Sequence, residues 1–122
     1  MTPPQHPFRA RLARGPLLCD GAMGTLLYER GVPYDRCFDA LNLTDRERVL
    51  NVHLDYLRAG AEMIETNTFG ANAMKLETHG LADRVRDINW HGAKIAKEAR
   101  DIIGKAVWIA GSIGPLGNTK SR

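Results

Sequence analysis

Two kinds of hydrophobic pattern alternate along the chain, and each predicts a different element. Short runs rich in apolar residues, at 17–19, 61–66 and 106–110, are typical of buried β-strands. Between them, apolar residues recur every three or four positions, which predicts α-helices. The predicted helices span 8–14, 25–30, 44–59, 71–79 and 81–103, and residues 32–43 are expected to form a loop.

Caps and buried faces define two of these helices most clearly. Thr44 and Glu47 stand in the positions of a capping box, in which each side chain accepts from the other residue's backbone amide. Gly60 and Gly104 stand where left-handed caps end the two helices. The expected buried face of the first contains Val49, Leu50, Val52, Leu54, Tyr56 and Leu57, and that of the second contains Leu81, Val85, Ile88, Ile95, Ala99 and Ile102.

The order strand, helix, strand, helices, strand predicts parallel strands joined by right-handed crossovers, and therefore an α/β fold. Each predicted strand ends in a polar loop that contains or adjoins glycine: Asp20-Gly21, Thr66-Asn67-Thr68 and Gly111-Ser112. Because the carboxyl ends of parallel strands carry the site in such folds, these loops are expected to meet on one side of the sheet.

Length and composition fit one small domain with a core, since the chain has 122 residues of which 43% are hydrophobic. We expect a tail and a short helix over 1–14, and the domain over 15–122. No apolar run approaches the roughly 18 residues of a membrane span, and the proline-rich start is unlike a signal peptide, so a cytoplasmic protein is expected. The net charge is +3, and basic residues are concentrated at the two ends of the chain without aromatic residues between them. This pattern is typical of a solvated surface and not of a nucleic-acid site.

Asp20 has two interpretations that the local sequence leaves open. Its carboxylate can cap the helical turn that follows, or it can contact a ligand. The amides of Gly21 and Ala22 can hold an anion at the start of that turn. The polar side chains of residues 66–68 likewise either line a cleft or only satisfy backbone groups at the end of a strand.

The residues by themselves predict neither a metal site nor a catalytic residue. The cysteines and histidines lack the spacing of metal ligands. Cys19 is expected to be a small buried side chain, and His53 a packed residue of a helix face. The loop 111–117 matches no nucleotide-binding glycine pattern, so a phosphate-binding α/β module is retained only as a third alternative.

Four segments together resemble the start of the homocysteine S-methyltransferase domain: DGAMGTLLYERG (20–31), DRCFDALNLT (35–44), YLRAGAEMIETNTFGAN (56–72) and AGSIGPLG (110–117). That domain occurs in cobalamin-dependent methionine synthase and in betaine–homocysteine methyltransferase. The stretch DRCFDALN is most similar to bacterial bifunctional proteins that join the domain to a methylenetetrahydrofolate reductase. The resemblance runs from about Leu17 to Gly117. It implies a (β/α)8 TIM barrel, of which this chain would supply about three parallel strands with their helices.

The resemblance also implies a chemistry. In the family, a zinc ion binds the thiol of homocysteine and stabilises its thiolate. The sulfur then takes a methyl group from a donor such as methylcobalamin or methyltetrahydrofolate, betaine or S-methylmethionine, which gives methionine. By position in the matching motif, Asp20 would hold the ammonium group of homocysteine, and the amides of Gly21 and Ala22 its carboxylate. Residues 66–68 would line the floor of the pocket.

The chain departs from the family pattern in one respect. The family's zinc ligands are cysteines of later strands, which Cys19 and Cys37 do not replace. Because such a barrel needs about 250 residues, we expect an N-terminal portion that is inactive alone and can self-associate through open strand edges. A non-catalytic fragment that binds a small ligand or another chain is the alternative. Zinc content and homocysteine titration would separate the two.

Overall fold

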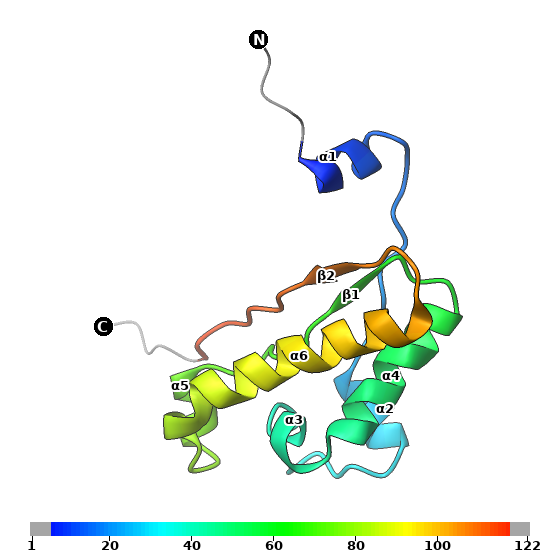
Figure 1. The fold of residues 1–122 in the computed structure, drawn as a ribbon. Helices are drawn as coiled ribbons and strands as arrows, with labels where there is room; N and C mark the ends of the chain where they lie inside the picture. The colour runs from blue at the N-terminus through cyan, green and yellow to red at the C-terminus, as the bar shows by residue number, and fades with distance from the viewer. Residues whose placement is uncertain (1–5, 118–122) are drawn as a thin grey trace.

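The computed structural model describes residues 6–117, so most of the predicted N-terminal tail and the basic C-terminal end lie outside the described residues. Figure 1 shows the elements in space. In chain order they are α1 (Pro7–Leu12), α2 (Gly24–Glu29), α3 (Leu41–Thr44), α4 (Arg46–Arg58), β1 (Met63–Glu65), α5 (Ala73–Glu77), the 3-10 turn η1 (Ala82–Arg84), α6 (Val85–Ile103) and β2 (Trp108–Ala110).

The strands β1 and β2 form a parallel sheet, which confirms the α/β class. On the other edge of β1, Cys19 pairs with Met63 in a single parallel bridge. β1 therefore lies between the segment that leads to Asp20 and β2. The register of the sheet pairs Met63 with Trp108, Ile64 with Ile109, and Glu65 with Ala110.

The prediction of a third strand at 17–19 is wrong for the described residues, because this segment forms a bridge and not a ladder. The carbonyl of Leu18 accepts from the amides of Glu62 and Met63, at 2.8 and 3.2 Å. Pro16 has no amide to donate before this segment, and a glycine turn begins directly after it. Pairing therefore has no room to lengthen in either direction.

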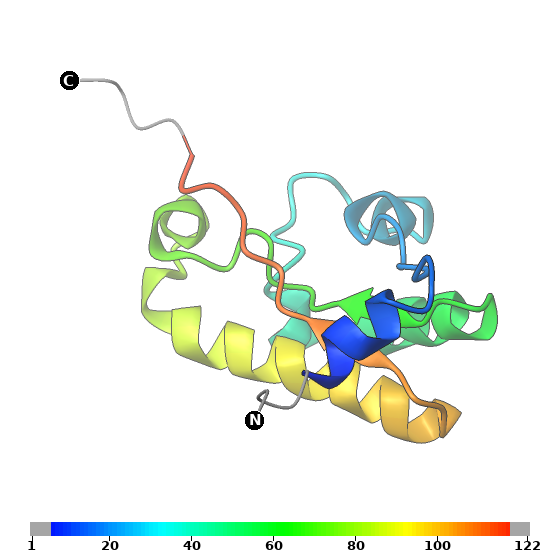
Figure 2. The ribbon, with the colours of Figure 1, turned by 90° about the horizontal axis from the view of Figure 1, so that it is seen from above.

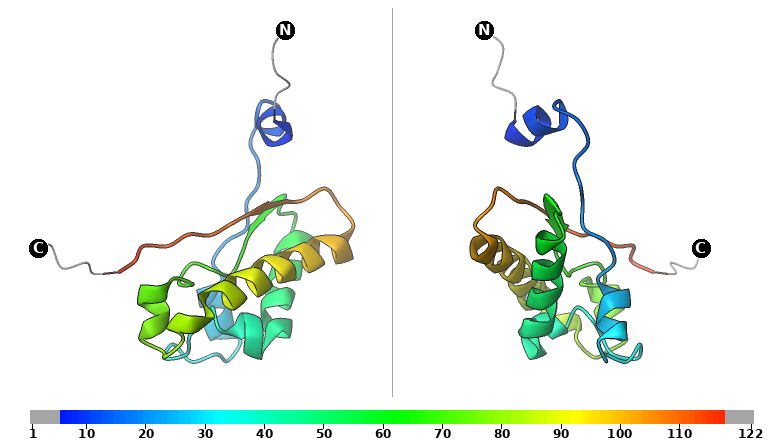
Figure 3. Two further views of the ribbon diagram at one scale, coloured as in Figure 1. Left: turned by 60° about the vertical axis from the view of Figure 1, so that its left-hand side comes forward. Right: turned by 90° about the vertical axis from the view of Figure 1, so that its right-hand side faces the viewer.

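Helices α4 and α6 pack against each other and lie on one side of the two strands, as Figures 1 and 3 show. The predicted face of α4 is confirmed, with Tyr56 half-buried and the other members buried. On α6, the prediction for Ile102 is wrong, because this side chain is 53% exposed and its neighbour Ile103 packs on the core instead. The core cluster includes Val49, Val52, Leu57, Ile64, Ile95, Ala96 and Ala99.

The predicted capping box at Thr44 is also wrong. Residues of the predicted loop form α3, and Thr44 is the last residue of that helix. Its hydroxyl donates to the carbonyl of Ala40 at 3.2 Å, four residues back. Asp45 is the N-cap of α4, and its carboxylate accepts from Arg48 and not from a backbone amide. Because α3 forms directly before α4, the Thr44 hydroxyl bonds to a carbonyl of α3 and does not cap α4.

The remaining boundaries shift by a few residues. The long helix begins at Val85 and follows the 3-10 turn η1, and Gly104 ends it with φ at 70°, as predicted. Helix α5 begins at Ala73, because the Asn72 side chain accepts from the amide of Lys75 at 2.9 Å and caps it.

Helix α1 is attached to the start of the sheet by one salt bridge and one aromatic contact. The guanidinium of Arg11 donates to the carboxylate of Glu62 at 2.7 Å. The ring of Phe8 meets the ring of Trp108 edge-on, with 5.2 Å between centroids. Figure 2, seen from above, shows α1 lying over this end of the sheet.

Candidate functional site

The three polar loops meet at the carboxyl ends of the strands, as the parallel order predicted. They line one hollow of about 520 Å³ together with residues from the segment before α3. The predicted site residues that line it are Asp20, Gly21, Ala22, Thr66, Asn67 and Thr68, with Ser112 from the loop after β2.

Asp20 contributes to the lining of this hollow a buried carboxylate oxygen that has no hydrogen-bond partner in the described part of the chain. Its Oδ2 accepts from the amide of Glu65 at 3.0 Å, whereas its Oδ1 is buried and has no partner among residues 6–117. Burial raises the pKa of Asp20, and the bond from the Glu65 amide opposes that rise. The N-cap of α2 is Met23, with no side-chain bond, so the alternative that Asp20 caps the following helix is wrong.

The turn after Asp20 is held in place by Tyr56 of α4. The Tyr56 hydroxyl donates to the carbonyl of Ala22 at 2.7 Å. A Cβ at Gly21 would lie 2.9 Å from the same hydroxyl oxygen, so the close approach of Tyr56 favours glycine at this position. Within the described part of the chain, the amides of Gly21 and Ala22 donate no hydrogen bond. Both amides are therefore free to donate to an anion.

Thr66 and Thr68 form a closed hydrogen-bond ring with Ser112. The Thr68 hydroxyl donates to the Ser112 carbonyl at 2.7 Å, so the Thr66 hydroxyl must be the donor in the 2.7 Å contact between the two threonines. The Ser112 amide in turn donates to Thr66 Oγ1 at 3.0 Å. Both hydroxyl hydrogens are thus used inside the protein, where they join the end of β1 to the end of β2.

Asn67 is used in the same way, through a buried amide pair with Asn42. Its Nδ2 donates to the Phe38 carbonyl at 2.9 Å and to Asn42 Oδ1 at 3.0 Å. Asn42 Nδ2 returns a bond to the Asn67 carbonyl at 2.8 Å and donates to that of Ile88 at 3.0 Å. The geometry of these side chains therefore fits the alternative in which they satisfy groups at the strand end.

Sequence reasoning missed several residues of the hollow. Phe38 and Asp39 line it from the predicted loop 32–43, for which no site residue was predicted, and Lys75 lines it from α5. Burial raises the pKa of Asp39, and a bond from the Gly70 amide opposes that rise. The sequence did contain a signal for Phe38 and Asp39, because both lie in the stretch DRCFDALN, which is one of the segments that resemble the family.

The cysteines and His53 lie apart from this hollow. The prediction that Cys19 is buried is wrong, because the bridge to β1 leaves the side chain exposed. Cys37 is half-buried, and burial raises the pKa of its thiol. His53 is 0% exposed, which confirms that it is packed within the helix face. Among residues 6–117, no three His, Cys, Asp or Glu side chains lie close enough together to hold a metal ion.

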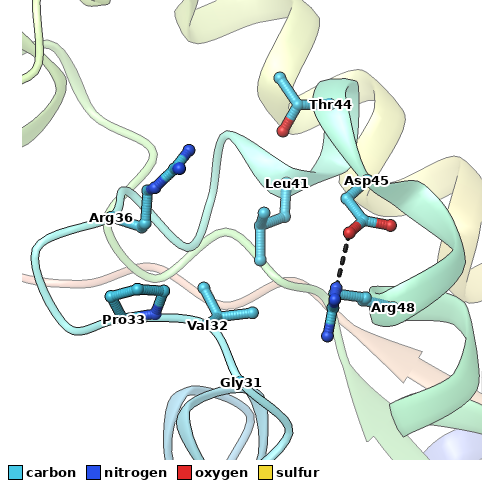
Figure 4. Close-up of a pocket in the computed structure, with 8 residues that line it drawn as sticks. All are labelled: Gly31, Val32, Pro33, Arg36, Leu41, Thr44, Asp45 and Arg48. Atoms are coloured by element: carbon cyan, nitrogen blue, oxygen red, sulfur yellow. Dashed lines mark hydrogen bonds and ion pairs between the residues drawn. The ribbon is translucent and has the colours of Figure 1, made fainter.

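A second hollow, of about 260 Å³, lies between the end of α2 and the start of α4 (Figure 4). Its wall is partly apolar, from Val32 and Leu41. Arg48 donates to the Asp45 carboxylate at 2.6 Å and to the Arg30 carbonyl at 2.7 Å. These charged groups satisfy one another, and no predicted site residue lines this hollow, so the candidate site is the hollow at the strand ends.

None of the helices described between residues 6 and 117 is both long and apolar enough to cross a membrane.

Parallel strands whose carboxyl ends carry a polar hollow are typical of α/β proteins, in which ligands generally bind at the strand ends. The family model for homocysteine S-methyltransferase matches residues 17–122, and the chain belongs to this family.

Similar proteins of known sequence and structure agree with this assignment. Methionine synthase of Mycobacterium tuberculosis (strain ATCC 25618 / H37Rv) is 35% identical over an alignment of 113 positions, which covers 85% of this chain and 10% of that protein. Methionine synthase of Mycobacterium leprae (strain TN) is 34% identical over an alignment of 126 positions, which covers 91% of this chain and 10% of that protein. The chain thus spans about a tenth of the length of these relatives.

The crystal structures of the homocysteine methyltransferase MmuM from Escherichia coli are similar in fold. The metallated form has a TM-score of 0.79 and 31% identity, and the match covers 92% of this chain and 42% of that one. The oxidized form has a TM-score of 0.80 and 32% identity, and covers 93% and 42%.

Proposed function

We propose that this chain supplies the homocysteine-binding part of a homocysteine S-methyltransferase, which methylates the sulfur of homocysteine to give methionine. Family membership supports the reaction. The observation that carries the binding role is the Asp20 turn. There, a carboxylate with a buried oxygen adjoins two amides at the edge of a polar hollow, and none of these three groups has a hydrogen-bond partner among residues 6–117.

The chemistry of an α-amino acid complements this turn. Its ammonium group is a cationic donor for the carboxylate of Asp20, and its carboxylate is an anionic acceptor for the amides of Gly21 and Ala22. A hydrogen bond to a charged group contributes about 1.5–3 kcal/mol, and an orphaned buried oxygen costs a similar amount. A ligand that donates to this oxygen therefore gains binding free energy from the new hydrogen bond and from removal of the cost of the orphaned oxygen.

Thr66, Asn67 and Thr68 have a different role in this proposal. Their side chains donate hydrogen bonds within the protein, among them those to Ser112, Phe38 and Asn42. Residues 66–68 therefore position the floor of the pocket. We propose that they shape the space that receives the side chain of homocysteine.

The zinc ion that the family resemblance implies does not fit the described residues by themselves, because they contain no cluster of metal ligands. Cys19 is exposed, and Cys37 is half-buried in the segment before α3. We propose that the zinc ligands belong to later strands of a complete barrel. The residues present here then bind the amino-acid end of the substrate and carry out no step of methyl transfer alone.

The exposed apolar side chains beside the sheet support the proposal that the isolated chain self-associates. Leu18 is 56% exposed and Ile113 is 93% exposed. The open edges of a short sheet favour pairing with another copy. Gel filtration at several concentrations tests this, and a sharp monomer peak with a cooperative melt would contradict it.

Calorimetric titration of the 122-residue chain tests the binding role. The ligands are L-homocysteine and 4-mercaptobutyrate, which lacks the ammonium group. We expect Asp20→Asn to weaken homocysteine binding by about tenfold or more and to leave 4-mercaptobutyrate binding unchanged. Asp83→Asn, at an exposed acid of η1 outside the hollow, is the matched control. Equal homocysteine affinity in the wild type and in Asp20→Asn would overturn the proposal.

A further inference from the structure

One wall of the strand-end hollow comes from the segment between α2 and α3, and two hydrogen bonds fasten this wall to the turn after β1. Asp39 Oδ1 accepts from the amide of Gly70 at 3.0 Å. The neighbouring carbonyl, that of Phe38, accepts from Asn67 Nδ2 at 2.9 Å. Two adjacent residues of a long connection are thereby held by two residues of one turn.

Gly70 fits closely against Asp39. A Cβ built on Gly70 would lie 2.6 Å from Asp39 Oδ2, closer than real Cβ contacts. Gly70 is not among the glycines with positive φ, so its backbone conformation alone would accept alanine. The close approach of the Asp39 carboxylate is therefore what favours glycine at this position.

Phe38, the residue next to Asp39, packs against the opposite side of the hollow. A Cβ at Gly24 would lie 3.2 Å from two carbons of the Phe38 ring, so the ring covers the end of the turn that begins at Asp20. Phe38 is half-buried, packs on the main core cluster and lines the hollow. A shift of Asp39 therefore moves a wall that stands against the substrate-binding turn.

We propose that Asp39 is a positioning residue for the substrate: by accepting the Gly70 amide, it fixes the Phe38 wall against the turn at residues 20–24 and so sets the affinity for homocysteine. This inference rests on the proposed function. The role of Asp39 differs from that of Asp20, because Asp39 acts through Gly70 and Phe38.

The test compares homocysteine affinity in four single variants and one double variant of the 122-residue chain. Asp39→Ala removes the acceptor, and we expect a loss of about tenfold. Asp39→Asn keeps an oxygen for the Gly70 amide, and we expect affinity within about twofold of the wild type. Asp35→Ala is the matched control, since Asp35 is an exposed acid of the same segment without a hydrogen bond or ion pair among the described residues.

Gly70→Ala gives an independent line of evidence, because its added Cβ displaces the Asp39 carboxylate. We expect a loss similar to that of Asp39→Ala. In the double variant the obstructing carboxylate is absent, so the combined loss should stay near about tenfold and not reach the about hundredfold of two independent effects.

Amide hydrogen exchange at Gly70 reports on the hydrogen bond itself, and melting curves report on the fold. We expect faster Gly70 exchange in Asp39→Ala than in Asp39→Asn or Asp35→Ala. If Asp39→Ala does not melt cooperatively, Asp39→Ser replaces it. Wild-type affinity in both Asp39→Ala and Gly70→Ala would overturn this inference alone. Absence of homocysteine binding by the wild-type chain would overturn the proposed function as well.

Discussion

Asp20 and His53 are both titratable residues with buried side-chain atoms that lack a hydrogen-bond partner within residues 6–117, yet their surroundings differ. Asp20 lines the hollow at the strand ends. His53 is fully buried on α4, where its neighbours along the helix, Val52 and Leu54, are also buried. The comparison teaches that a missing partner indicates a ligand where the group lines a cavity. In a packed core it indicates a cost to stability.

Burial shifts the pKa values of these two groups in opposite directions, because it disfavours the charged form of each. It raises the pKa of Asp20 and lowers the pKa of His53 to about 4. The free energy of unfolding contributed by His53 therefore rises with pH, whereas that contributed by Asp20 falls with pH. This difference in sign lets the two contributions be measured separately.

The largest effect is expected for His53. Its folded pKa of about 4 lies below the ordinary value of 6.5, so the unfolded chain binds more protons between these pH values. The free energy of unfolding should therefore fall by about 3 kcal/mol as the pH drops from 7 to 4. His53→Leu should remove most of this loss, measured by urea denaturation across that range.

His79→Leu is the control for this experiment, because His79 is exposed. It should leave the dependence on pH as in the wild type. An unchanged slope in His53→Leu would contradict the interpretation that His53 is a buried neutral group.

A smaller loss is expected when the ring at the floor of the pocket is broken. Thr68→Val leaves the Ser112 carbonyl and the Thr66 hydroxyl without their partner, which should lower the free energy of unfolding by about 1–3 kcal/mol. Homocysteine affinity should change less than in Asp20→Asn, because Thr68 positions the floor and does not hold the amino-acid group.

Thr78→Val is matched in chemistry but lies at an exposed helix end, where its hydroxyl donates to the Lys75 carbonyl at 2.7 Å. Its effect should stay within about 0.5 kcal/mol. Chemical denaturation measures both variants, and equal stabilities would show that the ring contributes nothing.

The smallest effect on stability is expected for Asp20. The pKa of Asp20 in the folded protein lies above the ordinary value of 3.8. At pH values between 3.8 and this raised pKa, the folded chain therefore binds more protons than the unfolded chain. Stability from this group therefore decreases as the pH rises through that window, and Asp20→Asn removes the decrease. At pH 7 the variant should be at least as stable as the wild type, with a gain smaller than the loss in Thr68→Val.

The same variant should bind homocysteine more weakly, so stability and affinity move in opposite directions. This pattern is typical of a ligand site. Thermal melts and titration calorimetry on Asp20→Asn measure the two quantities, and a variant that loses both would indicate a structural role for Asp20.

Local sequence patterns predicted some of these features and not others. The alternation of elements predicted that Asp20, the Thr66–Thr68 turn and Ser112 meet, because parallel strands align their carboxyl ends. Thr44 was assigned to the wrong cap, because a capping-box pattern does not show that a preceding helical turn offers a nearer carbonyl. The choice of Ile102 over Ile103 failed because both fit helical spacing after Ala99.

The sequence by itself determined the α/β class, the side of the sheet on which the three polar loops meet, and membership in the homocysteine S-methyltransferase family. Each of these follows from local patterns or from segments that match along the chain. Tertiary structure alone decided that one oxygen of Asp20 has no partner in the described part of the chain, while Thr66, Asn67 and Thr68 donate to other groups of the protein. It also brought Asp39 to Gly70, across 31 residues of sequence. The physical reason is that a side chain's free bonding capacity depends on neighbours distant in sequence, which only packing brings within hydrogen-bond distance.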